Sequence, residues 1–317
     1  MTSDCEPDRR SWLVRNRMTL LSAGAVAAYA AFVEWFWGWP ALLRQWSEIG
    51  FGAASSALML LIATYFIRCY RIYDYFPNET SGRFLPLLRV TQVHNLLNIM
   101  LPFRAGETSF PLLMRSEFSV PLARGTAALL VMRLLDLHAL LVVAVVGLVF
   151  GKASIALWII WFAALVSPLL FFLLKDRTIA LAHRLLPAKL EPVVDELEAG
   201  LPATLAAFLR AWGMTILNWA VKVIVLAWVL AFMGVAPLAA CFGGALGGEL
   251  SSVLPMHAPA GVGTYPAAIA AGAVSFGAPA GKAGLELLAT AGVNAHLLII
   301  VSAVAGTLLS MVLGKRR

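Results

Sequence analysis

Charged side chains that interrupt apolar stretches are the groups of this sequence that could do chemistry. Arg104 and Glu107 follow a Leu-Pro step in an otherwise apolar region. A guanidinium offers a planar fork of donors that matches the oxygens of a phosphate. We therefore predict that Arg104 binds an anionic group, the alternative being an interfacial arginine that only pairs with Glu107. Glu107 could bind an ammonium group, carry a proton or neutralise Arg104, and neutralisation is at least as well supported as the other roles.

Further charges lie in the apolar stretches that follow. Arg133 and Asp136 are three residues apart, so they can meet on one helical face, and a structural ion pair is the favoured interpretation for them. Lys222 lies near the middle of TILNWAVKVIVLAWVL, where an ammonium group needs an acidic partner or a hydrated cavity. We expect that partner to be Glu249, Glu107 or Asp136.

The histidines and cysteines bear on metal and cofactor chemistry. His257 could donate to a phosphate near neutral pH, although a single histidine is more often structural. The histidines show no HExxH spacing and the cysteines are widely separated, so we predict no metal and no cofactor. The residues that we predict to bind substrate are Arg104, Glu107, Arg133, Asp136, Lys222 and His257.

The overall composition decides what kind of protein must hold these charges. Of the 317 residues, 61% are hydrophobic and 13% are charged, which excludes a water-soluble surface. Several continuous apolar runs of about twenty residues are each long enough to cross a bilayer as a helix, whereas the strands of a barrel would alternate. The net charge of +7 indicates topology and anionic lipid rather than nucleic acid. We predict an all-α polytopic membrane protein.

Apolar length and flanking charge place about eight transmembrane helices. They lie near residues 18–37, 49–70, 85–101, 123–150, 153–174, 205–235, 237–254 and 285–313. A basic segment (1–17) precedes a first membrane half (18–174), and a polar connector (175–204), expected to contain one amphipathic surface helix, leads to a second half (205–317). The first span is interpreted as a retained anchor rather than a cleaved signal. Basic residues at both ends predict cytoplasmic termini in a plasma (inner) membrane.

Each half contains one apolar stretch that proline and glycine interrupt. The interrupting residues are Pro102, Gly106 and Pro111 in the first half and Pro255, Gly261 and Gly263 in the second. Proline removes a helix donor and glycine loosens the backbone. Paired breaks in two halves are typical of the midplane site of a transporter. We predict two re-entrant or broken segments, near 102–116 and 255–277, in a two-half pseudo-repeat.

These motifs resemble the lysylphosphatidylglycerol synthase transmembrane region, a family of flippase-like multi-pass membrane proteins. The resembling residues are Asn95 or Asn98, Leu101-Pro102, Arg104-Ala105-Gly106-Glu107, Arg133 and Asp136, then Leu254-Pro255 and Gly261-Val262-Gly263. Two positions depart from the family pattern. Tyr265-Pro266 stands where a glutamate is expected after Gly-x-Gly, and the last span has Asn294 and His296 in place of an arginine near its start. The resemblance implies a lipid-handling region without the soluble aminoacyl-transferring domain.

The favoured hypothesis is a flippase-like lipid translocase rather than an enzyme. A groove at the breaks would receive an anionic or aminoacylated phospholipid or a polyprenyl phosphate, with membrane lipids as partners. No GxxxxGK[ST] nucleotide motif is present, and proton coupling through Glu107 or Asp136 is a subsidiary hypothesis. One alternative is that the protein is a non-transporting partner of a lipid-modifying enzyme. The sequence also leaves open whether the protein forms homo-oligomers. The other is an intramembrane enzyme that pairs Ser251 or Ser252 with His257.

Overall fold

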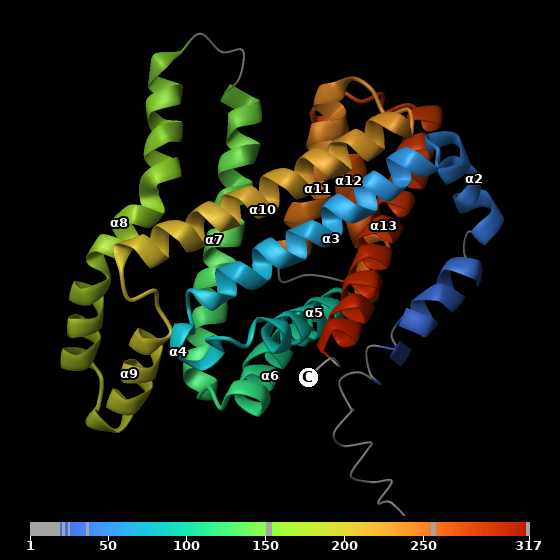
Figure 1. The fold of residues 1–317 in the computed structure, drawn as a ribbon. Helices are drawn as coiled ribbons and strands as arrows, with labels where there is room; N and C mark the ends of the chain where they lie inside the picture. The colour runs from blue at the N-terminus through green and yellow to red at the C-terminus, as the bar shows by residue number, and fades with distance from the viewer. Residues whose placement is uncertain are drawn as a thin grey trace, which may run out of the picture.

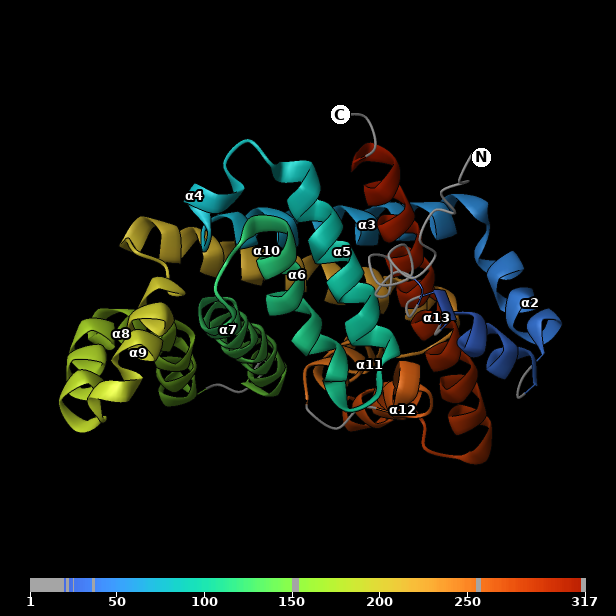
Figure 2. The ribbon, with the colours of Figure 1, turned by 90° about the horizontal axis from the view of Figure 1, so that it is seen from below.

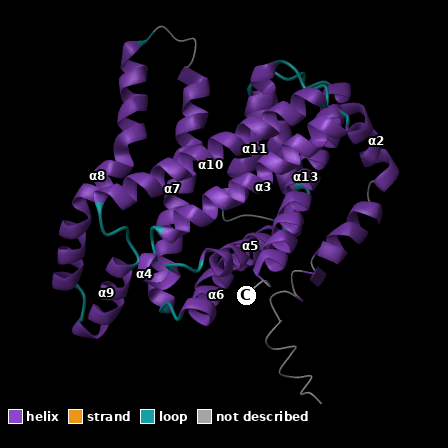
Figure 3. Cartoon of the chain, viewed as in Figure 1, coloured by secondary structure: helices purple, strands orange, loops and turns teal. Residues whose placement is uncertain are grey.

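The chain folds as a bundle of helices in the computed structural model, which describes residues 20, 23–24, 26–35, 38–149, 154–254 and 258–314 (Figure 1). Figure 3 shows helices and loops throughout these ranges and no strand in them, which confirms the all-α prediction. The helices are Val26–Trp35, α2 (Trp39–Ile49), α3 (Phe51–Tyr73), α4 (Pro77–Thr80), α5 (Phe84–Met100), η1 (Pro102–Thr108), α6 (Ser109–Phe118), α7 (Leu122–Val149), α8 (Ile155–Leu185), η2 (Ala188–Leu190), α9 (Glu191–Ala199), α10 (Leu205–Phe232), α11 (Leu238–Val253), η3 (Pro259–Gly261), α12 (Thr264–Ser275) and α13 (Lys282–Gly314).

Five helices in the described part of the chain are long and apolar enough to cross a bilayer. They are α3, residues 122–146 of α7, α8, α10 and α13. The helix Val26–Trp35 and α11 are apolar but shorter, and α5 has 17 residues. The protein is therefore a multi-pass helical membrane protein, and the predicted count of eight spans exceeds the five that length and hydropathy identify.

The connector differs from the single surface helix expected there. The span expected to end near residue 174 continues as α8 to Leu185, because no glycine or proline interrupts the sequence between residues 169 and 186. Leu186 is extended, as a residue before proline prefers, so Pro187 ends the helix. The rest of the connector forms η2 and the short helix α9. The prediction of one surface helix was wrong. A helix continues until a residue breaks its backbone pattern, even where the side chains change from apolar to polar.

Two long helices form the frame that carries the site. α3 and α10 lie side by side across the molecule, one from each half of the sequence (Figure 1). Seen from below, α5 and α6 are neighbours near the centre, and α13 lies beside α5 (Figure 2). α11 and α12 pack together so closely that a Cβ on Gly272 would lie 2.1 Å from the carbonyl oxygen of Gly243. Small residues permit such an approach of two membrane helices.

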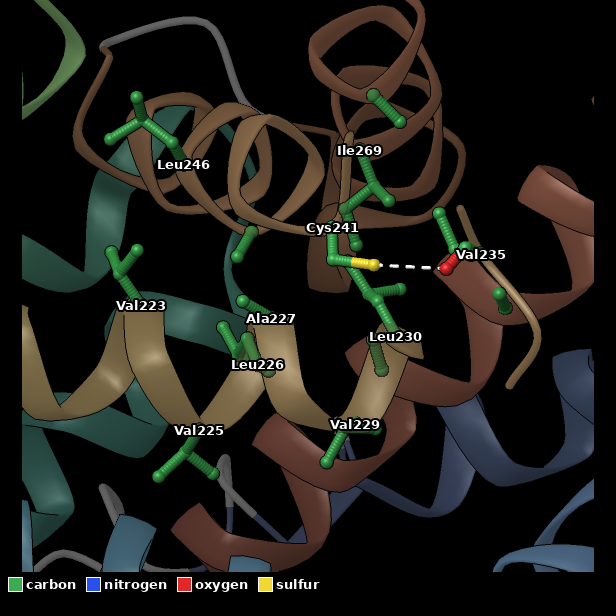
Figure 4. Close-up of a cluster of buried hydrophobic side chains, with 14 of the residues drawn as sticks. Val223, Val225, Leu226, Ala227, Val229, Leu230, Val235, Cys241, Leu246 and Ile269 are labelled. Carbon is green, nitrogen blue, oxygen red and sulfur yellow. Dashed lines mark hydrogen bonds between the residues drawn. The ribbon is translucent and has the colours of Figure 1, made fainter. Parts of the chain in front are cut away.

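The hydrophobic core between α10 and α11 holds the second half together. Figure 4 shows Val223, Leu226 and Leu230 of α10 among its buried side chains, together with Cys241 of α11. The Cys241 thiol donates a hydrogen bond to the carbonyl oxygen of Val235 at 3.0 Å. This apolar packing fixes α10 against α11 and so sets the distance between the charged residues that each helix carries.

Candidate functional site

Both predicted interruptions of the helices are present. α5 ends at Met100, and the 3-10 segment η1 leads directly into α6 at Ser109, so Pro111 lies within the first turn of a helix. In the second half η3 ends at Gly261 and α12 begins at Thr264. Residues 109–116 and 264–275 are therefore helical rather than irregular. Pro255 and His257 lie outside the described residues.

Glycine is required at the second break by the backbone conformation. Gly261 has a φ of 68° and Gly263 a φ of 74°, in the left-handed region that side chains disfavour. Gly261 ends η3 and Gly263 is the residue that precedes α12. The sequence identified both positions correctly as interruptions.

The two breaks meet through Arg104. Its Nη1 donates a hydrogen bond to the carbonyl oxygen of Ser252 at 2.9 Å, in the last turn of α11. A cation is stabilised there, because the carbonyl groups at a helix C-terminus carry a partial negative charge. Arg104 itself has a φ of 55°, which costs a residue with a side chain about 1 kcal/mol. The first break thus bonds directly to the end of the helix that leads into the second break.

The ion pairs expected within the first half are formed. Arg104 pairs with Glu107, and Arg133 contacts Asp136 at 3.1 Å. Arg133 Nε also lies 2.9 Å from the Glu107 carboxylate, so Glu107 is shared between two arginines. His94 Nε2 lies 3.4 Å from Arg133 Nη2. These contacts join η1 to α7 and bring four of the predicted site residues together.

Asp136 is the centre of a buried network that the sequence reasoning missed. Its carboxylate is fully buried and accepts hydrogen bonds from Arg71 of α3 at 2.6 Å and from Trp219 of α10 at 2.9 Å. Arg71 also donates to the hydroxyl of Thr215 at 2.8 Å. Asp136 therefore connects α3, α7 and α10. The available signal was the pair Arg68 and Arg71, spaced to share a face at the end of an apolar stretch.

Lys222 pairs with Glu249, one of the three partners expected for it. Nζ of Lys222 lies 2.8 Å from Glu249 Oε2. The carboxylate also accepts a hydrogen bond from the Tyr265 hydroxyl at 3.1 Å, and Lys222 stands over the Trp219 ring. Tyr265, which departs from the family pattern, thus points its hydroxyl at a glutamate that α11 supplies.

A pocket opens between these charged groups. We name it the polar pocket, and its polar lining residues are Tyr65, Arg68, Asn95, Asn98, Arg133, Lys222, Glu249, Ser252, Tyr265 and His296. Arg68 Nη1 donates to Asn95 Oδ1 at 2.5 Å. Arg68 Nε is buried without a hydrogen-bond partner in the described part of the chain. An unused donor in the pocket wall fits a ligand that accepts hydrogen bonds.

The charges in and around the pocket do not balance. The charge cluster, as we call this set, contains Arg68, Arg71, Arg104, Arg133 and Lys222 against Glu107, Asp136 and Glu249. Five cations and three carboxylates leave an excess of two positive charges. Since a buried charge without a counterion is costly, the cluster favours an anionic ligand.

Among the described residues, the structure shows no assembled site for a serine nucleophile and none for a metal ion. The Ser251 hydroxyl donates to the carbonyl oxygen of Gly248 at 2.7 Å, and that of Ser252 donates to the backbone carbonyl oxygen of Glu249 at 2.7 Å. Both hydroxyls are thus engaged with their own helix. The described residues hold no group of three or more metal-ligating side chains of the kind His, Cys, Asp or Glu.

Comparison with known proteins identifies the family. The model of the lysylphosphatidylglycerol synthase TM region matches residues 19–304, which include both breaks and the whole charge cluster. No curated protein and no solved structure matches the chain. Because the family model covers most of the 317 residues, the chain belongs to the lysylphosphatidylglycerol synthase transmembrane-region family.

Proposed function

We propose that the protein is a lipid translocase that moves a lipid with a negatively charged head group across the membrane. The observation that carries this proposal is the polar pocket with its excess of two positive charges, lying where the two breaks meet. A family named for a lipid synthase is consistent with a membrane region that handles lipid head groups. The pocket would hold the head group while the acyl chains stay in the surrounding lipid.

The chemistry of the pocket favours a phosphate as the recognised group. Arg68 and Lys222 line the pocket, and guanidinium and ammonium groups bind phosphate oxygens through charge-assisted hydrogen bonds. An anionic phospholipid, an aminoacylated phospholipid and a polyprenyl phosphate all present this group. We propose Arg104, Glu107, Arg133, Asp136 and Lys222 as the residues that bind it or shape its site, with His257 kept as a further candidate.

The membrane arrangement that fits this function has eight spans and two re-entrant segments. The segments α5–η1–α6 and α11–η3–α12 would enter the bilayer and reverse at their breaks. Their irregular backbone would then lie against other protein segments, since η1 contacts η3 and α5 contacts η3, so that protein and water can satisfy it. We further propose cytoplasmic termini and a location in the plasma (inner) membrane, on the basis of the basic residues at both ends.

The test is lipid exchange in proteoliposomes that contain head-group-labelled phosphatidylglycerol, with an impermeant quencher added outside. We expect the wild-type protein to expose inner-leaflet lipid to the quencher faster than protein-free vesicles do. Arg104→Ala is expected to slow this exchange by about tenfold to a hundredfold, because it removes the charged donor that ties η1 to Ser252 in the pocket wall, and a hydrogen bond to a charged group contributes about 1.5–3 kcal/mol. Glu107→Gln should slow it as well, since Glu107 positions two arginines.

Arg210→Ala is the matched control for these variants. Arg210 is half exposed and pairs only with Asp74 among the described acidic residues, away from the pocket. Its replacement is expected to leave exchange at the wild-type rate. Wild-type protein that exchanges no phosphatidylglycerol, aminoacylated phosphatidylglycerol or polyprenyl phosphate above the protein-free rate would contradict the proposal. Purification with a stoichiometric lipid-modifying enzyme would then favour the role of a membrane partner.

A further inference from the structure

The pair of Lys222 and Glu249 forms one wall of the polar pocket and differs from the other ion pairs of the charge cluster. Glu249 has 0% of its surface exposed, and Lys222 is the one described cation within ion-pair distance of it. Its other donors, Tyr265 and Ser252, are neutral hydroxyls at 3.1 and 3.4 Å. Asp136, by contrast, contacts two guanidinium groups, and Glu107 contacts two as well. Glu249 is therefore the carboxylate that depends on a single cation.

We infer that Glu249 takes up one proton for each negatively charged head group that binds beside Lys222, so that the protein couples lipid movement to a proton. This inference rests on the proposed function. It differs from the subsidiary hypothesis drawn from the sequence, which placed a proton on Glu107 or Asp136.

The physical reason is competition for one ammonium group. Lys222 lines the pocket, so a phosphate oxygen that enters can take its Nζ as a partner. Glu249 is then a buried carboxylate whose remaining hydrogen bonds come from hydroxyl groups. A buried charge without a counterion is strongly disfavoured, and protonation to the neutral acid removes it.

The other charged and titratable groups near Glu249 do not replace Lys222. Arg68 and Tyr65 face the pocket from α3, Arg133 from α7, Tyr265 from α12 and His296 from α13. Arg68 stays a cation, but it donates to Asn95 and no described carboxylate, Glu249 included, lies within ion-pair distance of it, while Arg133 is held by Glu107 and Asp136. Tyr265 stacks on His296 with ring centroids 4.6 Å apart. Among the described residues, Lys222 is thus the cation on which the negative charge of Glu249 depends. When Lys222 binds a phosphate instead, Glu249 loses this counterion.

The charges balance in this cycle. A head group with one negative charge enters with one proton, which converts the Glu249 carboxylate to the neutral acid. When the lipid leaves on the other side, Lys222 pairs with Glu249 again and the proton is released there. The complete step moves no net charge, and it drives the lipid toward the alkaline side of the membrane.

The experiment measures the distribution of labelled phosphatidylglycerol between leaflets under an imposed difference of one pH unit. One proton per lipid predicts about a tenfold excess of label in the leaflet on the alkaline side, since 1.4 kcal/mol corresponds to a factor of ten. Protein-free vesicles under the same gradient give the background. A pH dye trapped inside should record one proton entering per lipid that enters.

The Glu249→Gln variant tests whether Glu249 is the group that carries the proton. This variant cannot bind or release the proton, so the label should distribute as it does in protein-free vesicles. Glu286→Gln is the matched control, because Glu286 is an exposed carboxylate at the start of α13, and it should keep the tenfold excess. If Glu249→Gln fails to give a monodisperse protein, Lys222→Met combined with Glu249→Gln removes both charges and should also lack the response.

The outcomes distinguish this inference from the proposed function. Wild-type protein that exchanges lipid rapidly but distributes it evenly under the gradient would overturn proton coupling and leave translocation intact. A tenfold excess that persists in Glu249→Gln would overturn the assignment to Glu249. Absence of any exchange by the wild type would remove the proposed function and the inference together.

Discussion

Asp136→Asn is expected to lower the free energy of unfolding by about 3–5 kcal/mol, the range found when one partner of a buried ion pair is removed. Asp136 is fully buried and accepts from Arg71 and Trp219, while Arg133 contacts its second oxygen. An asparagine keeps the shape but not the charge. Arg71, with only 4% of its side chain exposed, then keeps its charge without a carboxylate partner. The measurement is reversible unfolding in mixed micelles.

Asp74→Asn is the matched control for the Asp136 prediction. Asp74 pairs with Arg210 at 2.7 Å, and although only 9% of the Asp74 side chain is exposed, 52% of the Arg210 side chain is, so the guanidinium left behind is solvated. Exposed pairs contribute about 0–1 kcal/mol, so this variant should unfold almost as the wild type does. Combining Asp136→Asn with Arg71→Met should recover part of the loss, because the buried Arg71 guanidinium that lost its partner is removed as well. Equal losses for the Asp136 and Asp74 variants would show that the buried network does not hold the three helices together.

Gly106→Ala is expected to cost about 3 kcal/mol in the free energy of unfolding and to slow lipid exchange as strongly as Arg104→Ala does. A Cβ at Gly106 would lie 2.4 Å from the carbonyl carbon and oxygen of Leu97 and 2.5 Å from Cα of Asn98. All three are backbone atoms of α5, so no side chain can rotate away. η1 would have to shift, and the flanking Arg104 and Glu107 would shift with it.

Gly213→Ala tests whether the effect at Gly106 comes from this close contact. Gly213 lies inside α10, and a Cβ there would meet no heavy atom within 4 Å beyond its own helix. Alanine is favoured over glycine inside a helix by up to about 1 kcal/mol, so this variant should be as stable as the wild type or slightly more stable. A Gly106→Ala protein with wild-type stability and exchange would refute the role of the close η1–α5 contact.

Local features of the sequence were sufficient for the helices, the breaks and the short-range ion pairs. Pro102 and Gly106 interrupt a helix through their own backbone chemistry, and the pairs Arg104–Glu107 and Arg133–Asp136 follow from a spacing of three residues. Pro111 was wrong as an interrupting residue, because it falls in the first turn of α6, where a proline is tolerated. Hydropathy likewise placed the end of α8 too early, since polarity alone does not stop a helix.

The sequence by itself determined that this is a helical membrane protein with two broken segments and charges beside them, because apolar length, backbone chemistry and spacing act over a few residues. Only the tertiary structure decided which distant groups share a site. Arg71 reaches Asp136 over 65 positions, and Arg104 reaches the end of α11 over 148. Lys222 had three candidate acids, and the packing of α10 against α11 selected Glu249. Such pairings depend on how whole helices pack, which no local pattern encodes.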